Sequence, residues 1–402
     1  MRPRRTAVGQ QRICLVTETY PPEINGVSLT LARLTEGLRQ QGYDVLLVRP
    51  RQKSSIQGES ALGDPSVTLV PGIPLPGYRG LRCGLPAGAA LTRLWSQQRP
   101  HAVYVATEGP LGWSAVQAAR RLAIPVFSGF HTNFHSYSKH YHAGWLRDLI
   151  LWYLCRFHTR TNGTVVSTPQ LRDRLRLKGV KNVTVLDRGV DSRLFSPERR
   201  SLELRRAWHA TESDVVVLYV GRLAPEKNLA LAVESYRAMQ RLNDRVNFVI
   251  VGDGPQRTAL QKNYPDLIFC GQLTGEQLAQ HYASADVFLF PSETETFGNV
   301  ILEAMASGLA VVAYDHAAAG LHITNGANGI LVPFGNRRAF IDAAARLPNR
   351  SGSLSKMRRQ AREHAASLDW RGVVEQFAAL LLGETSAVDA RHNSKSVRTA
   401  PV

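Results

Sequence analysis

Short apolar runs and amphipathic stretches alternate along the chain. Residues 12–17 (RICLVT) are a short apolar run, and residues 28–41 repeat apolar side chains at helical spacing until Gly42. A second apolar run follows at 44–48. Such runs indicate buried strands, and a glycine directly after a periodic stretch is a helix stop signal. The three segments therefore predict a strand–helix–strand unit, from which parallel sheets are built.

The same alternation recurs in two series. Segment 196–209 is charged, contains proline and is predicted to connect them. We expect a first domain at 12–197, completed by a C-terminal helix at about 368–383, and a second domain at 198–367. Residues 385–402 are polar and predicted to be disordered. Further strands are predicted at 102–106, 126–128 and 164–167 in the first series, and at 215–220, 247–251, 267–270, 287–289 and 310–313 in the second.

This organisation predicts an α/β protein made of two Rossmann-like, doubly wound domains. Ligands of such sheets bind at the carboxyl ends of the strands. With two such domains in tandem, we expect the site in a cleft across which they face each other. Candidate chemistry is therefore sought in the loops that follow strands.

Composition narrows the class of partner. The chain has 402 residues, 44% of them apolar, and a formal charge of +17, which favours anionic partners such as a nucleotide or an acidic lipid. No nucleic-acid-binding motif accompanies the basic residues, so nucleic acid is not expected as a partner. No run of 18 apolar residues occurs, and the N-terminus lacks the apolar stretch of a signal peptide. We expect a cytoplasmic protein.

The most informative loop is FPSETETFGNVILEAMASG at 290–308. A predicted strand ends at its start, and a helix begins near Asn299. Backbone N–H groups of Phe297, Gly298 and Asn299 would then lie at a helix N-terminus, where phosphate binds well. Glu295 is suited to accept hydrogen bonds from sugar hydroxyls, and Glu303 from a ribose diol. A capped helix with one solvated glutamate is the alternative for the two carboxylates taken alone.

A second loop, VGRLAPEKN at 220–228, also follows a strand. It brings two cations, Arg222 and Lys227, that can neutralise the charge of a leaving diphosphate in place of a metal ion. The chain has no Asp-x-Asp pair to anchor a metal–diphosphate complex, so no metal is expected. Solvated loop charges are the alternative.

Two weaker signals lie in the first half. His131, in GFHTNFH, comes just after a predicted strand and can hydrogen-bond a sugar or an acceptor, although a locally satisfied histidine has the same pattern. Gly26 opens a predicted helix, where its backbone can approach a ligand closely, although an ordinary turn is the alternative. The segment GDGP at 252–255 lacks the third glycine of the dinucleotide fingerprint and is not interpreted as a nicotinamide site.

Taken together, these segments resemble retaining glycosyltransferase family 4, which has the GT-B fold. The strings ETYPPEINGV, GFHTNF, RGVD, VGRLAPEKN, VGDGP and PSETETFGNVILEAMASG occur in the family's order over about residues 12–383. The resemblance implies that Glu295 contacts donor-sugar hydroxyls and that Glu303 holds the ribose. It implies no cofactor beyond a nucleotide diphosphate sugar, which is the donor substrate.

The resemblance also implies roles for the remaining candidates. Arg222 and Lys227 would bind the diphosphate, the backbone at 297–299 would contact sugar and phosphate, Gly26 would lie under the diphosphate, and His131 would contact the donor sugar near the reacting carbon. The final helix, 370–382, would cross back to the first domain. Transfer would retain the anomeric configuration, with the acceptor hydroxyl attacking from the leaving-group face and the departing diphosphate taking its proton.

One segment departs from the family pattern. Many relatives have a Gly-Gly pair and an acidic residue before I-x-x-G-x-N-G, where this chain has Ala318, Ala319, Gly320 and His322. In the family fold this loop lies near the donor, so the departure bears on which sugar nucleotide is used.

The acceptor is expected to be a lipid or a lipid-linked sugar. Residues 146–157 are apolar with aromatic and basic members, and residues 170–178 (QLRDRLRLK) are strongly basic, so either segment can lie on an anionic bilayer. A buried core helix and a solvated helix face are the alternatives. Within the family, the chain is similar to bacterial GDP-mannose-dependent α-mannosyltransferases and to sulfoquinovosyl- and glucosyl-diacylglycerol synthases. A soluble or polysaccharide acceptor, a GT-B sugar-nucleotide epimerase, a non-catalytic scaffold and a nucleic-acid binder are the rival hypotheses.

Overall fold

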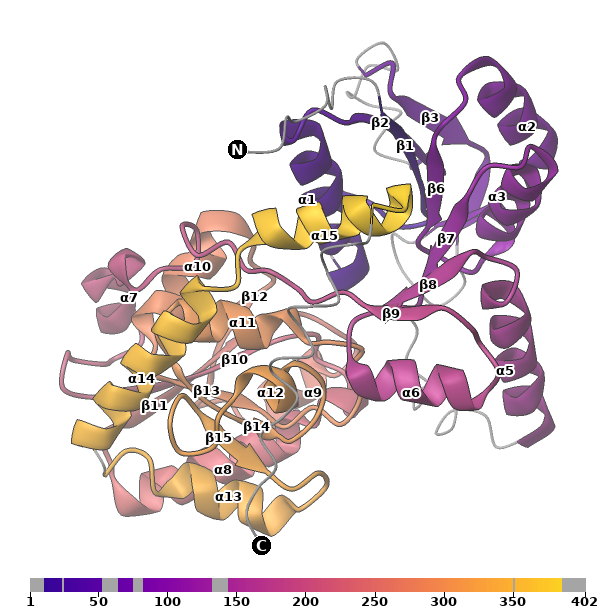
Figure 1. Cartoon of the computed structure of the whole chain (residues 1–402). Coiled ribbons are helices and arrows are strands. Elements are labelled where there is room, and N and C mark those ends of the chain that lie inside the picture. Colours follow the sequence, from indigo (N-terminus) through magenta and orange to yellow (C-terminus); the bar gives the residue numbers. More distant parts are fainter. Residues whose placement is uncertain are drawn as a thin grey trace, which may run out of the picture. The chain divides into compact units, whose positions relative to one another are not determined.

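The computed structural model describes residues 11–23, 25–52, 64–74, 82–131, 144–349 and 351–384, without the side chains of 144–147 and 351. Two compact units make up the chain (Figure 1). The first contains Met1–Asp187 and Trp370–Val402, and the second contains Arg188–Asp369. The tail at 385–402, for which disorder was expected, lies outside the described residues.

The first unit contains a parallel sheet with the strand order β3-β2-β1-β6-β7-β8-β9. Strands β4 and β5 form a separate antiparallel pair. The chain runs outward from β1 in one direction and from β6 in the other, which makes the unit doubly wound. The strands are β1 Arg12–Val16, β2 Asp44–Pro50, β3 Val67–Val70, β4 Gly72–Pro74, β5 Arg82–Gly84, β6 Ala102–Val105, β7 Val126–Gly129, β8 Gly163–Val166 and β9 Val183–Val185.

Helices cover both faces of this sheet. Residues of α1 and α15 pack with β1 and β6 in one apolar cluster, and residues of α2 and α3 pack with the same strands in another. The described helices of the unit are α1 Gly26–Gln40, α2 Gly88–Gln97, α3 Pro110–Arg121, α5 Gly144–His158, α6 Pro169–Leu177 and α15 Trp370–Leu382.

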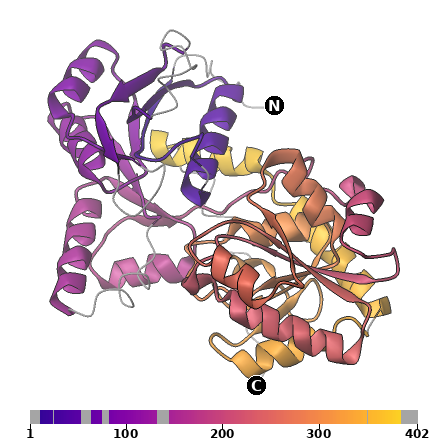
Figure 2. The same ribbon diagram turned by 180° about the vertical axis from the view of Figure 1, so that it is seen from behind.

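The final helix belongs to the first unit although it follows the second in sequence. Figure 2 shows α15 lying beside α1. A Cβ on Gly37 would come within 2.5 Å of Val374 Cγ2, so the missing side chain lets α15 approach α1 closely. The predicted span, 370–382, agrees with the span of the helix.

The second unit contains a parallel sheet in the order β12-β11-β10-β13-β14-β15. Val216 and Leu218 of β10 face one apolar cluster, whereas Val217 and Tyr219 face the other. Both faces are therefore buried, which explains why these strands are continuous apolar runs. The strands are β10 Val215–Val220, β11 Val246–Val251, β12 Ile268–Gly271, β13 Val287–Phe290, β14 Ala310–Tyr314 and β15 Ile330–Val332.

Helices again flank the strands. The described helical segments of this unit are η2 Pro197–Arg199, α7 Leu202–Ala207, η3 Pro225–Lys227, α8 Leu229–Leu242, α9 Arg257–Asn263, α10 Gly275–Ser284, α11 Asn299–Ala306, α12 Ala317–His322, α13 Arg337–Ala345 and α14 Ser351–Ala366. With both sheets parallel and doubly wound, the predicted α/β class is confirmed.

The boundary between the units falls at Asp187/Arg188 and not at the expected 197/198. The segment expected to connect the units, 196–209, folds into the second unit. Arg205 is 1% exposed and donates to Asp286 Oδ2 at 2.9 Å and to the Ser284 carbonyl at 2.8 Å. In the sequence this charged stretch resembles a solvated linker. Its arginine is in fact buried against Asp286, a partner that lies far along the chain and that the local sequence does not indicate.

Candidate active site

The second sheet brings two predicted loops to one edge. Strands β10 and β13 are adjacent and parallel, and the strand order reverses between them. The loop after β10 carries Arg222 and Lys227, and the loop after β13 carries Glu295. Because parallel strands end at the same edge, these loops share the position at which doubly wound sheets bind ligands.

Lys227 and Glu295 are in direct contact. The Lys227 ammonium donates to Glu295 Oε1, and the two side chains are only 18% and 15% exposed. The ammonium also lies 6.0 Å from the centre of the Phe290 ring. A partly desolvated ion pair is held more firmly than a surface pair and is less screened by salt. The family resemblance implies that Lys227 binds the diphosphate and that Glu295 contacts the sugar hydroxyls. The structure places the two side chains in contact with each other.

Arg222 is oriented differently. Its guanidinium pairs with Glu226, one turn along the loop, and half of the side chain is exposed. Glu226 was not predicted to take part, because a glutamate beside a lysine in a loop is an ordinary solvated pair in the sequence. The contact leaves Arg222 at the surface, while Lys227 is the more buried of the two cations.

The N-terminus of α11 has the features of an anion site. Gly298 precedes the helix with a φ of 95°, and no described side chain caps the helix there. A side chain at this φ would be strained, so glycine is required. The first N–H groups of a helix have no partner within the helix and carry the positive end of its dipole. The backbone at 297–299 therefore lies at a helix start that no described side chain caps.

Glu303 lies on α11 and accepts a hydrogen bond from the hydroxyl of Tyr282, on α10, at 3.0 Å. Burial, and then the charge of Glu303, raise the pKa of Tyr282 well above its usual value, so the hydroxyl stays protonated and donates. Tyr282 thus fixes the carboxylate that was predicted to hold a ribose. Nothing in the sequence points to Tyr282, since it looks like any apolar residue of a buried helix face.

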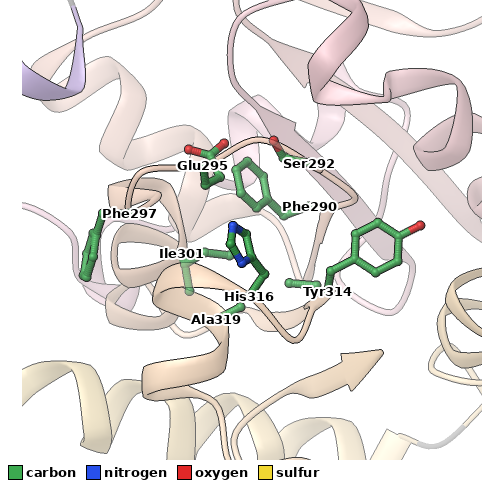
Figure 3. Close-up of a pocket in the computed structure, with 9 residues that line it drawn as sticks. Phe290, Ser292, Glu295, Phe297, Ile301, Tyr314, His316 and Ala319 are labelled. Atoms are coloured by element: carbon green, nitrogen blue, oxygen red, sulfur yellow. The ribbon is translucent and has the colours of Figure 1, made fainter. Parts of the chain in front are cut away.

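A small pocket lies beside Glu295. Figure 3 shows Glu295 at its rim and the His316 ring inside, whereas the Tyr314 hydroxyl points away from His316. Ser292 Oγ and Tyr314 Oη are buried without a hydrogen-bond partner in the described part of the chain. The pocket is lined by Phe290, Ser292, Glu295, Phe297, Ile301, Ala313, Tyr314, His316 and Ala319.

The segment that departs from the family pattern packs against the same loop. The Ala318 N–H donates to the Phe297 carbonyl at 2.8 Å. His322 is 5% exposed, and its ring meets the Phe297 ring edge-on with 5.9 Å between centres. These contacts hold the main chain at Phe297, directly before Gly298, in place.

The glycines of the GDGP segment have a packing role. A Cβ on Gly252 would come within 1.9 Å of the Gly221 carbonyl oxygen, and one on Gly254 within 2.4 Å of the Leu223 carbonyl oxygen. These close approaches let the loops after β10 and β11 lie against each other.

His131 and Gly26 belong to the first unit. His131 follows β7, and its Nε2 lies 3.2 Å from the Tyr104 hydroxyl. Residues 132–135, the rest of the predicted motif, are outside the described residues. Gly26 is the first residue of α1 and is exposed, but the Asn25 side chain already accepts hydrogen bonds from the N–H groups of Val27 and Ser28.

No group of three or more His, Cys, Asp or Glu side chains in the described ranges is placed to hold a metal ion. Within the same ranges, every helix is too short or too polar to cross a bilayer.

Comparison with solved structures identifies the fold. HepE of Anabaena, solved in complex with UDP, superposes on the chain with a TM-score of 0.74 at 19% identity and covers 93% of this chain and 100% of its own. At such identity the likeness establishes the fold alone. That fold is the GT-B fold of glycosyltransferases, as the resemblance implied.

Sequence comparison identifies the family. The model described as "Glycosyltransferase Family 4" matches residues 24–194, and the model described as "Glycosyl transferases group 1" matches residues 214–350. The GDP-mannose-dependent alpha-mannosyltransferase of Corynebacterium glutamicum is 32% identical over 91% of this chain and 87% of its own. The chain belongs to glycosyltransferase family 4, and the predicted family is confirmed.

A more distant relative has a lipid product in its name. The alpha-monoglucosyldiacylglycerol synthase of Streptococcus pneumoniae is 28% identical over 75% of this chain and 71% of its own. Membership of the family makes the protein a glycosyltransferase that uses a nucleotide-sugar donor.

Proposed function

We propose that this protein transfers a mannosyl residue from GDP-mannose, with retention of configuration and without a metal ion, to a lipid or lipid-linked acceptor at the cytoplasmic face of a membrane. The observation that carries the proposal is the contact between Lys227 and Glu295 beside the N-terminus of α11, which no described side chain caps. A cation, a carboxylate and a helix N-terminus suit a phosphate joined to a sugar.

The proposal gives each group of this unit a role. Lys227 and Arg222 bind the diphosphate and stabilise the charge that develops on it as it leaves. The backbone of residues 297–299 contacts sugar and phosphate at the helix N-terminus. Glu295 accepts hydrogen bonds from the sugar and keeps Lys227 in position, while Glu303, held by Tyr282, binds the ribose.

In the first unit, His131 contacts the donor sugar near the reacting carbon, and Gly26 lies under the diphosphate. The Tyr104 hydroxyl beside His131 Nε2 limits the orientations that the ring can take. The acceptor hydroxyl attacks the anomeric carbon from the leaving-group face, and its proton passes to the departing diphosphate oxygen. Exclusion of water from the bound donor protects it from hydrolysis.

The identity of the donor and acceptor is argued from relatives. The C. glutamicum relative is named for GDP-mannose, and the S. pneumoniae relative for a glucosyl lipid. The former is more similar to the chain, so GDP-mannose is preferred over a UDP-hexose. A lipid acceptor is consistent with the excess of basic residues, which gives the chain a charge of +17.

The test is a donor screen with the purified full chain. GDP-mannose, UDP-glucose, UDP-galactose and UDP-sulfoquinovose are offered with detergent-dispersed lipid acceptors in the presence of EDTA, and nucleoside diphosphate release is measured. We expect acceptor-dependent release of GDP from GDP-mannose, and an α-linked mannolipid by NMR. In Glu295→Gln, the rate should fall about a hundredfold or more.

Glu293→Gln is the matched control, because it neutralises a carboxylate of the same loop that has no proposed role; its rate should stay within about threefold of the unmodified chain. Release from a UDP-hexose alone would replace the donor, and a β-linked product would refute retention. Equal losses in the two variants would refute the role of Glu295.

A further inference from the structure

Helices α5 and α6 of the first unit adjoin each other in both views of the molecule (Figures 1 and 2). Leu154 of α5 packs with Leu171 and Leu175 of α6 in one buried cluster. Each helix therefore has an inner face that is buried by packing and an outer face that carries its exposed residues.

The outer face of α5 exposes large apolar and aromatic side chains beside the charged residues Asp148 and Arg156. Trp152 is 57% exposed and Leu149 is 51% exposed. The Arg156 guanidinium lies over the Trp152 ring at 5.4 Å and does not cover it from solvent. An exposed tryptophan with an arginine beside it is typical of residues that lie at a lipid–water interface.

The outer face of α6 is basic around one leucine. Leu177, the last residue of the helix, is 87% exposed. Arg174, Arg176 and Lys178 surround it and are all exposed. Asp173 is the acidic member of the group, and its charge is already offset by Arg172 at 2.9 Å. The end of this helix thus presents an apolar tip within a ring of cations.

The two outer faces are continuous. Cys155 of α5 packs against the buried cluster that contains Leu171 and Leu175 of α6, and Lys178 directly follows α6. Cys155 is three residues from Trp152, and residues at this spacing are neighbours on a helix surface. The basic end of α6 therefore borders the aromatic face of α5.

We propose that this α5–α6 surface, consisting of Leu149, Trp152, Arg156, Arg174, Arg176, Leu177 and Lys178, docks on a bilayer rich in anionic phospholipid. Its cations complement phosphate headgroups, while the tryptophan and the leucines enter the boundary between headgroups and acyl chains. The inference rests on the proposed lipid acceptor, because docking brings the first unit to the membrane in which that acceptor resides.

The chemistry of the surface favours lipid over other anionic partners. A nucleic acid would be bound by the cations alone, and exposed Leu177 and Leu149 would add nothing to phosphate contacts. On a bilayer, both parts of the surface contribute, since each basic residue near an anionic membrane adds to binding and each buried apolar group adds to it as well.

The experiment measures sedimentation of the full chain with phosphatidylcholine vesicles, with or without phosphatidylglycerol. We expect binding to the mixed vesicles that weakens as salt is raised. Arg174→Gln/Lys178→Gln should weaken it roughly twentyfold, or about fivefold for each charge, and Trp152→Ser on the order of tenfold.

The controls make the same changes elsewhere. Arg241→Gln/Lys262→Gln removes one exposed arginine and one exposed lysine from the second unit, and Leu242→Ser removes a leucine that is 57% exposed. Both should bind vesicles within about twofold of the unmodified chain. Circular dichroism and thermal unfolding check that all variants are folded.

Equal losses in the surface variants and the controls would overturn the proposal, and so would binding that does not distinguish mixed from pure phosphatidylcholine vesicles. Failure of the proposed function looks different. In that case the surface variants lose vesicle binding while no donor is turned over in detergent. If both proposals hold, Arg174→Gln/Lys178→Gln keeps its rate on a detergent-dispersed acceptor, and Glu295→Gln keeps its vesicle binding.

Discussion

The two units differ at the helices that follow the two strands between which the strand order reverses, α1 and α3 in the first unit and α8 and α11 in the second. In the first unit, Asn25 caps α1, and Glu18 from the loop after β1 accepts the N–H of Leu111, in the first turn of α3, at 3.1 Å. In the second unit, neither α8 nor α11 has a side-chain cap among the described residues. The same backbone thus offers occupied donors in one unit and donors without a side-chain cap in the other.

The difference separates helix starts that the protein's own side chains cap from helix starts that can bind an anion. A helix N-terminus attracts an anion only while its N–H groups have no internal acceptor. At α1 and α3 the first unit supplies acceptors from its own side chains, whereas at α8 and α11 the second unit leaves this position to a ligand. We therefore expect changes at the starts of α8 and α11 to affect donor use, and changes to the side chains that cap α1 and α3 to affect stability.

The largest effect on activity is expected at Lys227. Lys227→Ala removes the more buried of the two cations and leaves Glu295 without its partner. The value of kcat/KM should fall about 10²–10³-fold. Arg222→Ala, at the half-exposed cation, should cost only about tenfold. Steady-state kinetics with the donor from the screen measures both.

Because Lys227 and Glu295 touch, their effects should not add. The double variant Lys227→Ala/Glu295→Ala should lose less than the product of the two single losses. An additive double variant, or a loss in Arg222→Ala as large as that in Lys227→Ala, would contradict the arrangement described for this loop.

The next effect concerns the pH dependence of stability. Burial raises the pKa of Glu18 to about 7, with hydrogen bonds from Leu111 and Gly112 acting against the shift. The folded chain then binds this proton more tightly than the unfolded chain. Stability from Glu18 is complete below the unfolded pKa near 4.5 and is lost as pH rises through about 7. The full change amounts to about 3 kcal/mol.

Glu18→Gln should therefore flatten the pH profile. The variant should match the unmodified chain at acid pH and be more stable above neutrality, by about 2–3 kcal/mol in urea denaturation. Glu36→Gln changes an exposed carboxylate of the same unit and should leave the profile as it is. A profile that is unchanged in Glu18→Gln would show that Glu18 is not the group responsible.

A smaller effect separates backbone strain from ligand binding at Gly298. Both Gly298→Ala and Gly335→Ala place a side chain at a positive φ, 95° and 77° respectively. Each should lower the free energy of unfolding by about 1–2 kcal/mol. Only Gly298→Ala disturbs the N-terminus of α11, so only this variant should weaken nucleotide binding in calorimetry. Equal nucleotide affinities in the two variants would argue against an anion site there.

The smallest expected effect is that of one hydroxyl. Tyr282→Phe removes the hydrogen bond to Glu303 and should weaken donor binding roughly tenfold, as expected for a bond to a charged group. Tyr314→Phe removes a buried hydroxyl with no partner in the described ranges and should change binding by less than about twofold. If the two variants behave alike, Tyr282 does not orient Glu303.

Most of the fold was predictable because the signal is local. Val215–Val220 agrees with its predicted span, since a buried strand imposes a continuous apolar run on the sequence, and Trp370–Leu382 agrees with the span that the family resemblance implied. The short strands β9 and β15 were missed because three residues carry too little pattern. Segment 196–209 was misassigned because Asp286, the partner of Arg205, is remote in sequence.

In the candidate site, too, the features with a local signal were predictable and the contacts between distant segments were not. By itself, the sequence determined the family, the two doubly wound sheets, and the loops that carry Lys227, Glu295 and Gly298, because a strand end followed by a glycine-opened helix is a local pattern. Only the tertiary structure decided that Lys227 pairs with Glu295 and that Tyr282 holds Glu303. It also decided that the outer face of α5 exposes Trp152. Pairing and exposure depend on which distant segments pack together, and the local period of a sequence is the same whichever partner a side chain meets.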